Sequence, residues 1–298
     1  MKKVLILGAN GMLGSSMHQV LSKKDLELFS TTRSGEVLKE SKNFKFDAVQ
    51  DDIDVILSEI GGVDFVVNCI GLISHKMTGE STSDEVNAFI LNSIFPFKLA
   101  IAGLASKSKV IQISTDCVFS GNLGPYSEDS KHDAHDIYGL SKSLGEVLAP
   151  NVMNLRCSII GNEQGTSFSL MDWFLNQDSK GSVKGYVNHK WNGLTTLSFS
   201  KIVSGIILQD KFYGGLHHLI PSNVVTKFEL LALINKYGRS KPIKLIEFDS
   251  EKSVDRELTT NAPDRNVSLW NSGGYSRIPS IEDMLVEYFR HKGGENFE

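Results

Sequence analysis

The sequence predicts an α/β fold built on a doubly wound parallel sheet, with a smaller α/β domain attached. In the first half of the chain, short apolar runs alternate with segments of helical periodicity, which is typical of βαβ units. Runs such as "VLIL" and "FVVN" are apolar throughout, as in parallel strands that are covered on both faces. The second half is less regular, which indicates a companion domain packed on the first.

Each apolar run and helical pattern predicts an element of this fold. The first half predicts strands at 3–8, 26–32, 44–49, 63–71, 109–115 and 151–160, with helices at 12–22, 51–60, 83–106 and from 136 onward. The second half predicts a loop–helix insertion at 161–190, helices at 196–209, 226–238 and 280–291, and a strand and turn at 214–222. We assign 1–160 and about 191–213 to the sheet domain, and about 161–190 and 214–298 to the companion domain.

The composition narrows the class of partner. A formal net charge of -4 offers no basic surface for nucleic acid or an anionic membrane. No run approaches the ~18 apolar residues of a membrane span, and the N-terminal "MKKVLILG" is interpreted as a first strand rather than a signal peptide. Cys69, Cys117 and Cys157 form neither a disulfide framework nor a metal-binding pattern. We therefore expect a cytoplasmic protein without a bound metal, a nucleic-acid partner or a membrane.

The turn after the first strand carries a glycine pattern, G-x-x-G-x-x-G, in "GANGMLG". Glycines at these positions allow a tight turn, a close approach of the backbone to a pyrophosphate, and close packing of helix on strand. The start of the following helix offers free N–H groups to phosphates. The pattern predicts a dinucleotide site of the Rossmann type, with the cofactor contacted by Gly8, Asn10, Gly11, Met12 and Leu13.

The end of the second strand reads "STTRSG" and contains no carboxylate for the hydroxyls of an adenosine ribose. The hydroxyl of Thr32 and the guanidinium of Arg33 instead suit a 2′-phosphate. This indicates NADP(H), with NAD(H) as the alternative. Asp47, after the third strand, is a candidate for the adenine amino group, and a plain turn role for it is equally open.

Tyr138 and Lys142 stand four positions apart in "DIYGLSKSLGEVL", so both side chains share one face of a helix. A free phenol has a pKa of about 10, which a neighbouring ammonium lowers. The fifth strand ends in "STD", at the edge of the sheet where ligands gather. We expect Thr115 to hold a substrate carbonyl oxygen and Tyr138 to protonate it as hydride arrives. Lys142 is expected to tune Tyr138 and to bond the nicotinamide ribose.

An ordered set of motifs resembles the extended short-chain dehydrogenases/reductases and, within them, the dTDP-4-dehydrorhamnose reductases. The matching pieces are "GANGMLG", "VDFVVNCIG", "AFILNS", "STDCVFSG", "PYSEDS", "YGLSK" and "RCSIIG", which lie within residues 1–160; "WNGLTT" and "KSVDREL" match more loosely. The resemblance implies Thr115, Tyr138 and Lys142 as the catalytic set, NADPH or NADH as donor, and a nucleotide-linked 4-keto-6-deoxysugar as substrate. The two predicted domains then bind NADP and substrate respectively, in polysaccharide precursor synthesis.

The same resemblance implies further contacts. Cofactor contacts are implied at Cys69, Ile70, Gly71 and Asn92, the last supporting the site more through structure than chemistry, and substrate contacts at Ser74, Asp116, Cys117, Trp191 and Arg256. From their residue types, Trp191 suits stacking on a base or sugar, and Lys184, Lys190 and Arg256 suit a diphosphate. A solvated lysine face and a tryptophan that anchors the domain joint are equally open.

Departures from the family pattern leave alternatives. Those reductases read "STDYVF", and here Cys117 replaces the tyrosine. Related dehydratases place Glu after "STD" for elimination, so the absence of that carboxylate favours reduction. A sugar-nucleotide epimerase or epimerase–reductase remains open, as does a non-catalytic NADP-binding regulatory subunit, against which the intact Tyr and Lys weigh. The apolar stripe of the helix at 83–106 is core or a homodimer face.

Overall fold

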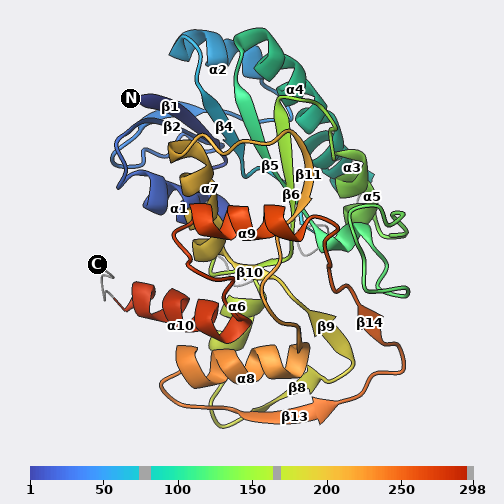
Figure 1. The fold of residues 1–298 in the computed structure, drawn as a ribbon. Coiled ribbons are helices and arrows are strands. Elements are labelled where there is room, and N and C mark those ends of the chain that lie inside the picture. Colours follow the sequence, from blue (N-terminus) through green and yellow to red (C-terminus); the bar gives the residue numbers. More distant parts are fainter. Residues whose placement is uncertain (74–81, 164–168, 294–298) are drawn as a thin grey trace.

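A seven-stranded parallel sheet occupies the centre of one half of the molecule (Figure 1). The computed structural model describes residues 1–73, 82–163 and 169–293. β1 pairs with β2 on one side and with β4 on the other, so the chain winds outward in both directions from this point. In spatial order the strands are β11 (Gly215–His218), β6 (Val152–Arg156), β5 (Lys109–Ser114), β4 (Phe65–Asn68), β1 (Lys2–Leu7), β2 (Leu26–Thr32) and β3 (Lys42–Lys45). This is the predicted doubly wound fold.

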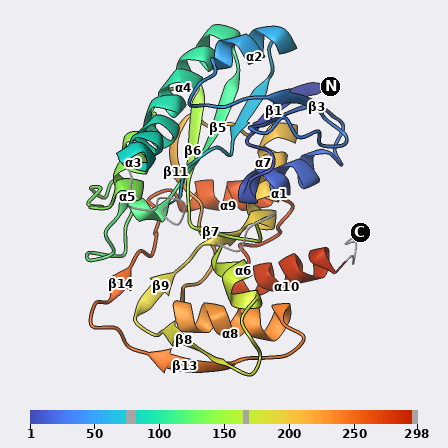
Figure 2. The ribbon, with the colours of Figure 1, turned by 180° about the vertical axis from the view of Figure 1, so that it is seen from behind.

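Helices cover both faces of the sheet, as Figures 1 and 2 show from opposite sides. Alternate residues of β1 therefore enter different cores: Val4 and Ile6 pack on one face, and Leu5 and Leu7 on the other. All four are fully buried, each stabilising the fold by about 1.5–3 kcal/mol. The first face carries α1 (Met12–Leu21), α7 (Thr196–Leu208) and α9 (Pro263–Ser272), and the second carries α2 (Ile53–Ile60) and α4 (Phe95–Ser106).

The long helix predicted at 83–106 consists of three parts. α3 (Thr82–Phe89) and α4 are joined by a π-helical segment, η2 (Ile90–Ile94). Such a bulge re-aims one side chain, and π-bulges recur at functional sites. By length and composition the span Thr82–Ser106 would also cross a membrane, which the sequence analysis did not predict. Half of the relevant window is buried against the sheet, as in a core helix.

The other half of the molecule contains short strands and helices below the carboxyl ends of the sheet strands (Figure 1). Here β9 (His189–Trp191) lies between β12 (Val225–Thr226) and β14 (Val254–Asp255). The remaining strand pairs are β8 (Ser182–Tyr186) with β13 (Lys244–Phe248) and β7 (Ile159–Ile160) with β10 (Leu194–Thr195), and the helices are α6 (Leu170–Leu175), α8 (Lys227–Gly238) and α10 (Ile281–Lys292).

Three differences from the predicted elements have local causes. The third strand covers 42–45 instead of 44–49, because Asp47 and Asp51 close a turn directly after it. The run 151–160 splits into β6 and β7, since β7 leaves the main sheet to pair with β10. The helix α9 was not predicted, although it begins at Pro263, a residue preorganised for the first turn of a helix.

Candidate active site

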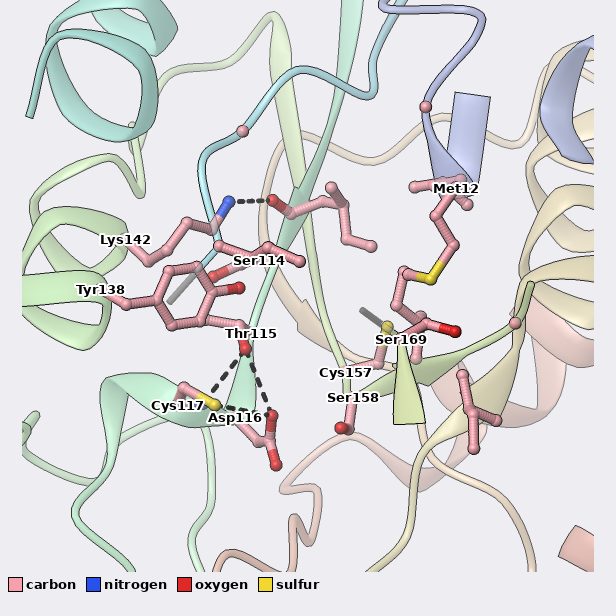
Figure 3. A pocket seen from close by; sticks show the side chains of 18 of the residues that line it. Met12, Ser114, Thr115, Asp116, Cys117, Tyr138, Lys142, Cys157, Ser158 and Ser169 are labelled. Carbon is pink, nitrogen blue, oxygen red and sulfur yellow. Dashed lines mark hydrogen bonds between the residues drawn. The ribbon is translucent and has the colours of Figure 1, made fainter. Parts of the chain in front are cut away.

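A pocket of about 310 Å³ opens at the carboxyl ends of β1, β4 and β5. This is the point where the strand order reverses, the general ligand site of doubly wound sheets. Its walls are the loops after these strands, α5 (Ile137–Leu144), and residues of β7 and α8 from the other half of the molecule. The pocket brings together most of the residues that the sequence nominated (Figure 3).

The glycine loop has the geometry of a phosphate cradle. Gly8 adopts a φ of +74°, and a Cβ on Gly14 would lie 2.0 Å from the carbonyl oxygen of Gly8. Gly11 caps α1 without a side-chain hydrogen bond, so the first N–H groups of α1 lack a capping side chain. Gly11, Met12 and Leu13 line the pocket, whereas Gly8 and Asn10 are not among its lining residues. These features fit a dinucleotide pyrophosphate.

The loop after β2 holds its residues differently from the prediction. The Thr32 hydroxyl is buried and donates to the carbonyl oxygen of Glu36 at 3.2 Å, so it serves the loop. Arg33 is exposed and stays a candidate for a 2′-phosphate. Glu36 follows directly after the predicted stretch 30–35, and its carboxylate accepts from the Asn10 amide at 3.4 Å. Asp47 accepts from the Val49 amide at 3.0 Å, the turn role that was left open.

The loop after β4 is positioned by Asn92. Its side-chain oxygen accepts from the Leu72 amide at 2.9 Å, while its amide donates to the Leu72 carbonyl at 2.8 Å and to the Ser141 hydroxyl at 3.0 Å. The π-helical segment η2 thus ties this loop to α5. Cys69, Ile70, Gly71 and Asn92 all line the pocket, and Ser74 lies outside the described residues.

Thr115 and Tyr138 face each other in the pocket (Figure 3). The Thr115 hydroxyl accepts from the Cys117 amide and donates to a carboxylate oxygen of Asp116, both at 3.2 Å. Burial raises the pKa of Tyr138 well above its usual value, the nearby Cys117 raises it further, and a hydrogen bond with Thr115 opposes the shift. Tyr138 is therefore a protonated phenol, ready to donate, throughout the neutral range.

Lys142 lies on the same face of α5 but is held by a different contact from the expected one. Its ammonium donates to the carbonyl oxygen of Ile113 at 2.8 Å. Burial lowers the pKa of Lys142 to about 8, opposed by the carboxylate of Glu146. The expectation that Lys142 lowers the pKa of Tyr138 is wrong for this structure, because burial dominates at Tyr138 and the lysine points to the backbone of β5.

A buried ionic network behind the site was missed by sequence reasoning. Arg156, fully buried on β6, donates to both carboxylate oxygens of Glu146, at 2.9 and 2.5 Å, and contacts ring nitrogens of His132 and His218. The Ser114 hydroxyl also donates to Glu146. The network therefore ties the residue before Thr115 to the end of α5.

Cys117 and Arg256 meet below the catalytic set. The guanidinium of Arg256 donates to the Phe119 carbonyl at 2.8 Å and contacts the Cys117 sulfur at 3.6 Å. Burial, reinforced by Asp116, raises the pKa of the Cys117 thiol to about 12, which disfavours a thiolate. Asp116 and Cys117 line the pocket, and Arg256 supports them from outside it.

The floor of the pocket comes from the other half of the molecule. Trp191 is buried there and donates from its indole nitrogen to the Ser158 hydroxyl at 2.9 Å. Lys227, which the sequence analysis did not single out, also lines this floor. Lys190 pairs with Asp255 at 2.7 Å and Lys184 lies over the Phe248 ring, and neither lines the pocket. Among the described residues, no group of three or more His, Cys, Asp or Glu side chains is arranged to hold a metal ion.

Comparison with known families decides where the chain belongs. Residues 1–257 match the model of the family described as "RmlD substrate binding domain". The chain belongs to this family. Among curated members and relatives, the RmlD-like chain is 31% identical over 151 residues to the spore coat polysaccharide biosynthesis protein SpsK of Bacillus subtilis, covering 50% of this chain and 48% of that protein.

Two further relatives differ in function from each other. A dTDP-4-dehydrorhamnose reductase of Streptomyces griseus is 29% identical over 143 residues, 48% of this chain and 43% of that protein. The methionine adenosyltransferase 2 subunit beta of Danio rerio is 23% identical over 245 residues, covering 78% of this chain and 73% of that protein. The alignments to SpsK and to the Streptomyces reductase span about half the length of those proteins.

Solved structures confirm the RmlD-like fold over the whole chain. A dTDP-4-dehydrorhamnose reductase ortholog from Clostridium acetobutylicum superposes with a TM-score of 0.77 at 20% identity, covering 98% of this chain and 99% of that one. A dTDP-4-dehydrorhamnose reductase from Bacillus anthracis, solved in complex with NADP, superposes with a TM-score of 0.76 at 19% identity, with coverages of 98% and 99%.

Proposed function

We propose that this chain is an NADP(H)-dependent reductase of the 4-keto group of a nucleotide-activated 6-deoxysugar. The observation that carries the proposal is the convergence of Thr115, Tyr138 and Lys142 on a pocket whose opposite wall is the glycine loop. Carbonyl reduction requires three groups beside a dinucleotide site: a hydroxyl that holds the carbonyl oxygen, a protonated phenol that gives it a proton, and a lysine that holds the cofactor.

NADP(H) would lie along the glycine loop, with its pyrophosphate at the start of α1 and its nicotinamide beside the loop after β4. When bound, it supplies the hydride. The Thr115 hydroxyl holds the substrate carbonyl oxygen, and Tyr138 gives that oxygen its proton. Lys142 bonds the nicotinamide ribose.

Arg33 supports NADP(H) over NAD(H), because its exposed guanidinium can pair with a 2′-phosphate. The Bacillus anthracis reductase, crystallised with NADP, supports the same choice. Glu36 favours NAD(H), since its carboxylate beside Asn10 can accept from ribose hydroxyls. To decide between the two cofactors, the Kd values of NADPH and NADH are measured for wild type and for the Arg33→Ala variant. Selective weakening of NADPH binding supports NADP(H).

The biological setting follows from the same proposal. The names of the relatives, a spore coat polysaccharide biosynthesis protein and a dTDP-4-dehydrorhamnose reductase, support a role in polysaccharide precursor synthesis. In the cytoplasm, the half of the molecule built on the seven-stranded sheet would bind NADP(H), and the other half the sugar. β11 and α9, which the sequence division at 214–298 assigned to the sugar domain, belong to the sheet half, because β11 pairs with β6 and α9 packs on α7. The three cysteines are free thiols, consistent with a reducing compartment.

The test is turnover. NADPH oxidation is followed with a panel of nucleotide-linked 4-keto-6-deoxysugars, with wild type beside Tyr138→Phe. We expect one sugar to be reduced, and the variant to lose about 10²–10⁴-fold in kcat while its Kd for NADPH stays unchanged. Tight NADPH binding without turnover on any sugar would overturn the reductase and favour a regulatory subunit.

The epimerase alternative has its own signature. Running the reaction in deuterated water and analysing the product by mass spectrometry detects deprotonation of the carbon next to the keto group. Deuterium at that carbon indicates an epimerase–reductase. Its absence, together with NADPH consumption, leaves the simple reductase.

A further inference from the structure

Lys227 is a cation on the substrate side of the pocket. It is the first residue of α8, far along the chain from the catalytic set, and it lines the same pocket as Asp116, Cys117 and Trp191. The side chain is partly buried. The negative charge of Asp116 acts on it across the pocket, and the positive charge of Arg256 repels it.

The ammonium of Lys227 lacks a partner that would explain its position. Within residues 1–73, 82–163 and 169–293 it forms no hydrogen bond or ion pair, and its one aromatic contact is the Trp191 ring, with Nζ 5.3 Å from the centroid. One carboxylate oxygen of Asp116 accepts from both Thr115 and Cys117, and no ion pair joins Asp116 to Lys227 in the described residues.

The fold does not need this lysine. A cation in the first turn of a helix opposes the helix dipole. α8 is already capped by Thr226 and Glu229, whose side chains satisfy each other's backbone N–H groups. A charge that is partly desolvated, badly placed for its helix and directed into a pocket indicates an anionic ligand.

We propose that Lys227 determines substrate specificity by binding an anionic oxygen of the substrate, with the Trp191 ring supporting its ammonium. The inference rests on the proposed function in assuming a nucleotide-sugar substrate. The anion has two chemical sources in that class, the diphosphate linking nucleotide to sugar and a carboxylate on the sugar ring. Both present a delocalised negative oxygen to a lysine point charge.

The experiment measures equilibrium binding by calorimetry in the presence of NADP⁺, so it does not depend on turnover. Lys227→Met removes the charge and keeps the length, and Lys227→Arg restores the charge. Lys184→Met is the matched control, since Lys184 also lies over an aromatic ring, 4.8 Å from the Phe248 centroid, but outside the pocket. The probes are dTDP, UDP and two UDP-sugars that differ only in a carboxylate, UDP-glucose and UDP-glucuronic acid.

If the anion is the diphosphate, Lys227→Met weakens dTDP or UDP binding about tenfold or more. If it is a carboxylate, binding of the bare nucleotides is unchanged and only the acidic sugar nucleotide loses affinity. In both cases Lys227→Arg retains most of the affinity, Lys184→Met has no effect, and the Kd for NADPH is unchanged.

A folded Lys227→Met variant that binds every probe as wild type does would overturn the inference. The urea midpoint of each variant establishes that it is folded. Because the probes carry no 4-keto group, this outcome is independent of whether the reductase proposal holds.

Discussion

At the scale of single residues, two glycines of the same loop carry different steric constraints. A Cβ on Gly14 would lie 2.0 Å from the carbonyl oxygen of Gly8. This oxygen belongs to the backbone and cannot rotate away as a side chain could, so α1 would have to move away from β1. A Cβ on Gly11 would meet the same oxygen at 3.4 Å, an ordinary contact, and Gly11 has a negative φ of −75°.

We therefore expect Gly14→Ala to lower the free energy of unfolding by about 1–3 kcal/mol and to weaken NADPH binding. Gly11→Ala should unfold close to wild type. Urea denaturation and NADPH titration of both variants check this. Equal urea midpoints for the two variants would contradict the proposed close packing of helix on strand.

Lys142 predicts a pH dependence. Its pKa is lowered to about 8, so it loses its proton as the pH rises through that value, while the raised pKa of Tyr138 keeps the phenol protonated. If the ammonium is needed, kcat/KM for the reduction falls above pH 8. Lys142→Arg, which stays charged, should remove this alkaline limb at a lower overall rate. A wild-type profile that stays flat well above pH 8 would contradict the role of Lys142.

At the scale of secondary-structure elements, the Arg156–Glu146 pair joins three of them. Arg156 lies on β6, Glu146 follows α5, and the Ser114 hydroxyl at the end of β5 donates to the same carboxylate. The pair is buried, so removing one partner leaves an uncompensated charge in a region of low dielectric constant.

We expect Glu146→Gln to lower the free energy of unfolding by about 3–5 kcal/mol. The control is Asp210→Asn, which removes an exposed pair with Lys109 and should change stability by less than about 1 kcal/mol. Asn tolerates the positive φ of 55° at this position. Chemical denaturation compares the two, and an equally small effect in both would show that the buried network does not hold these elements together.

At the scale of the whole molecule, apolar side chains stay exposed along one face of the long helix. Ile94, Phe97, Ile101 and Leu104 are between 49% and 68% exposed. They recur every three or four positions, and exposed Leu140 and Leu144 extend the apolar surface onto α5, which packs against η2. A contiguous apolar surface of this kind is typical of an interface.

We propose that a second copy of the chain covers this face, as expected for a homodimer. Sedimentation velocity should then show a dimer for wild type and a monomer for the double variant Phe97→Glu/Ile101→Glu, with the monomer still folded by circular dichroism. A wild-type monomer at every concentration tested would refute the homodimer.

The parts of the fold that depend on near neighbours were predictable. Strand β2 was predicted at its observed limits, 26–32, because a short segment of apolar and β-branched residues between polar turns is typical of a strand. The four-residue spacing of Tyr138 and Lys142 predicted that they share one helix face, and both line the pocket. The Thr32 hydroxyl donates within its own loop instead of facing a 2′-phosphate, and Asp47 takes the turn role that was one of its two predicted alternatives.

The sequence by itself determined the doubly wound sheet and predicted the glycine loop and the Tyr138–Lys142 pair, because these depend on periodicity and on groups within a few residues of one another. Thr115 was predicted from its place at the end of a strand. Only the tertiary structure decided what surrounds that set. Burial, which no spacing reports, raises the pKa of Tyr138 and lowers that of Lys142. Arg256 contacts Cys117, and Lys227 lines the pocket. Both placements depend on how the two halves of the chain pack together, which no local sequence pattern reports.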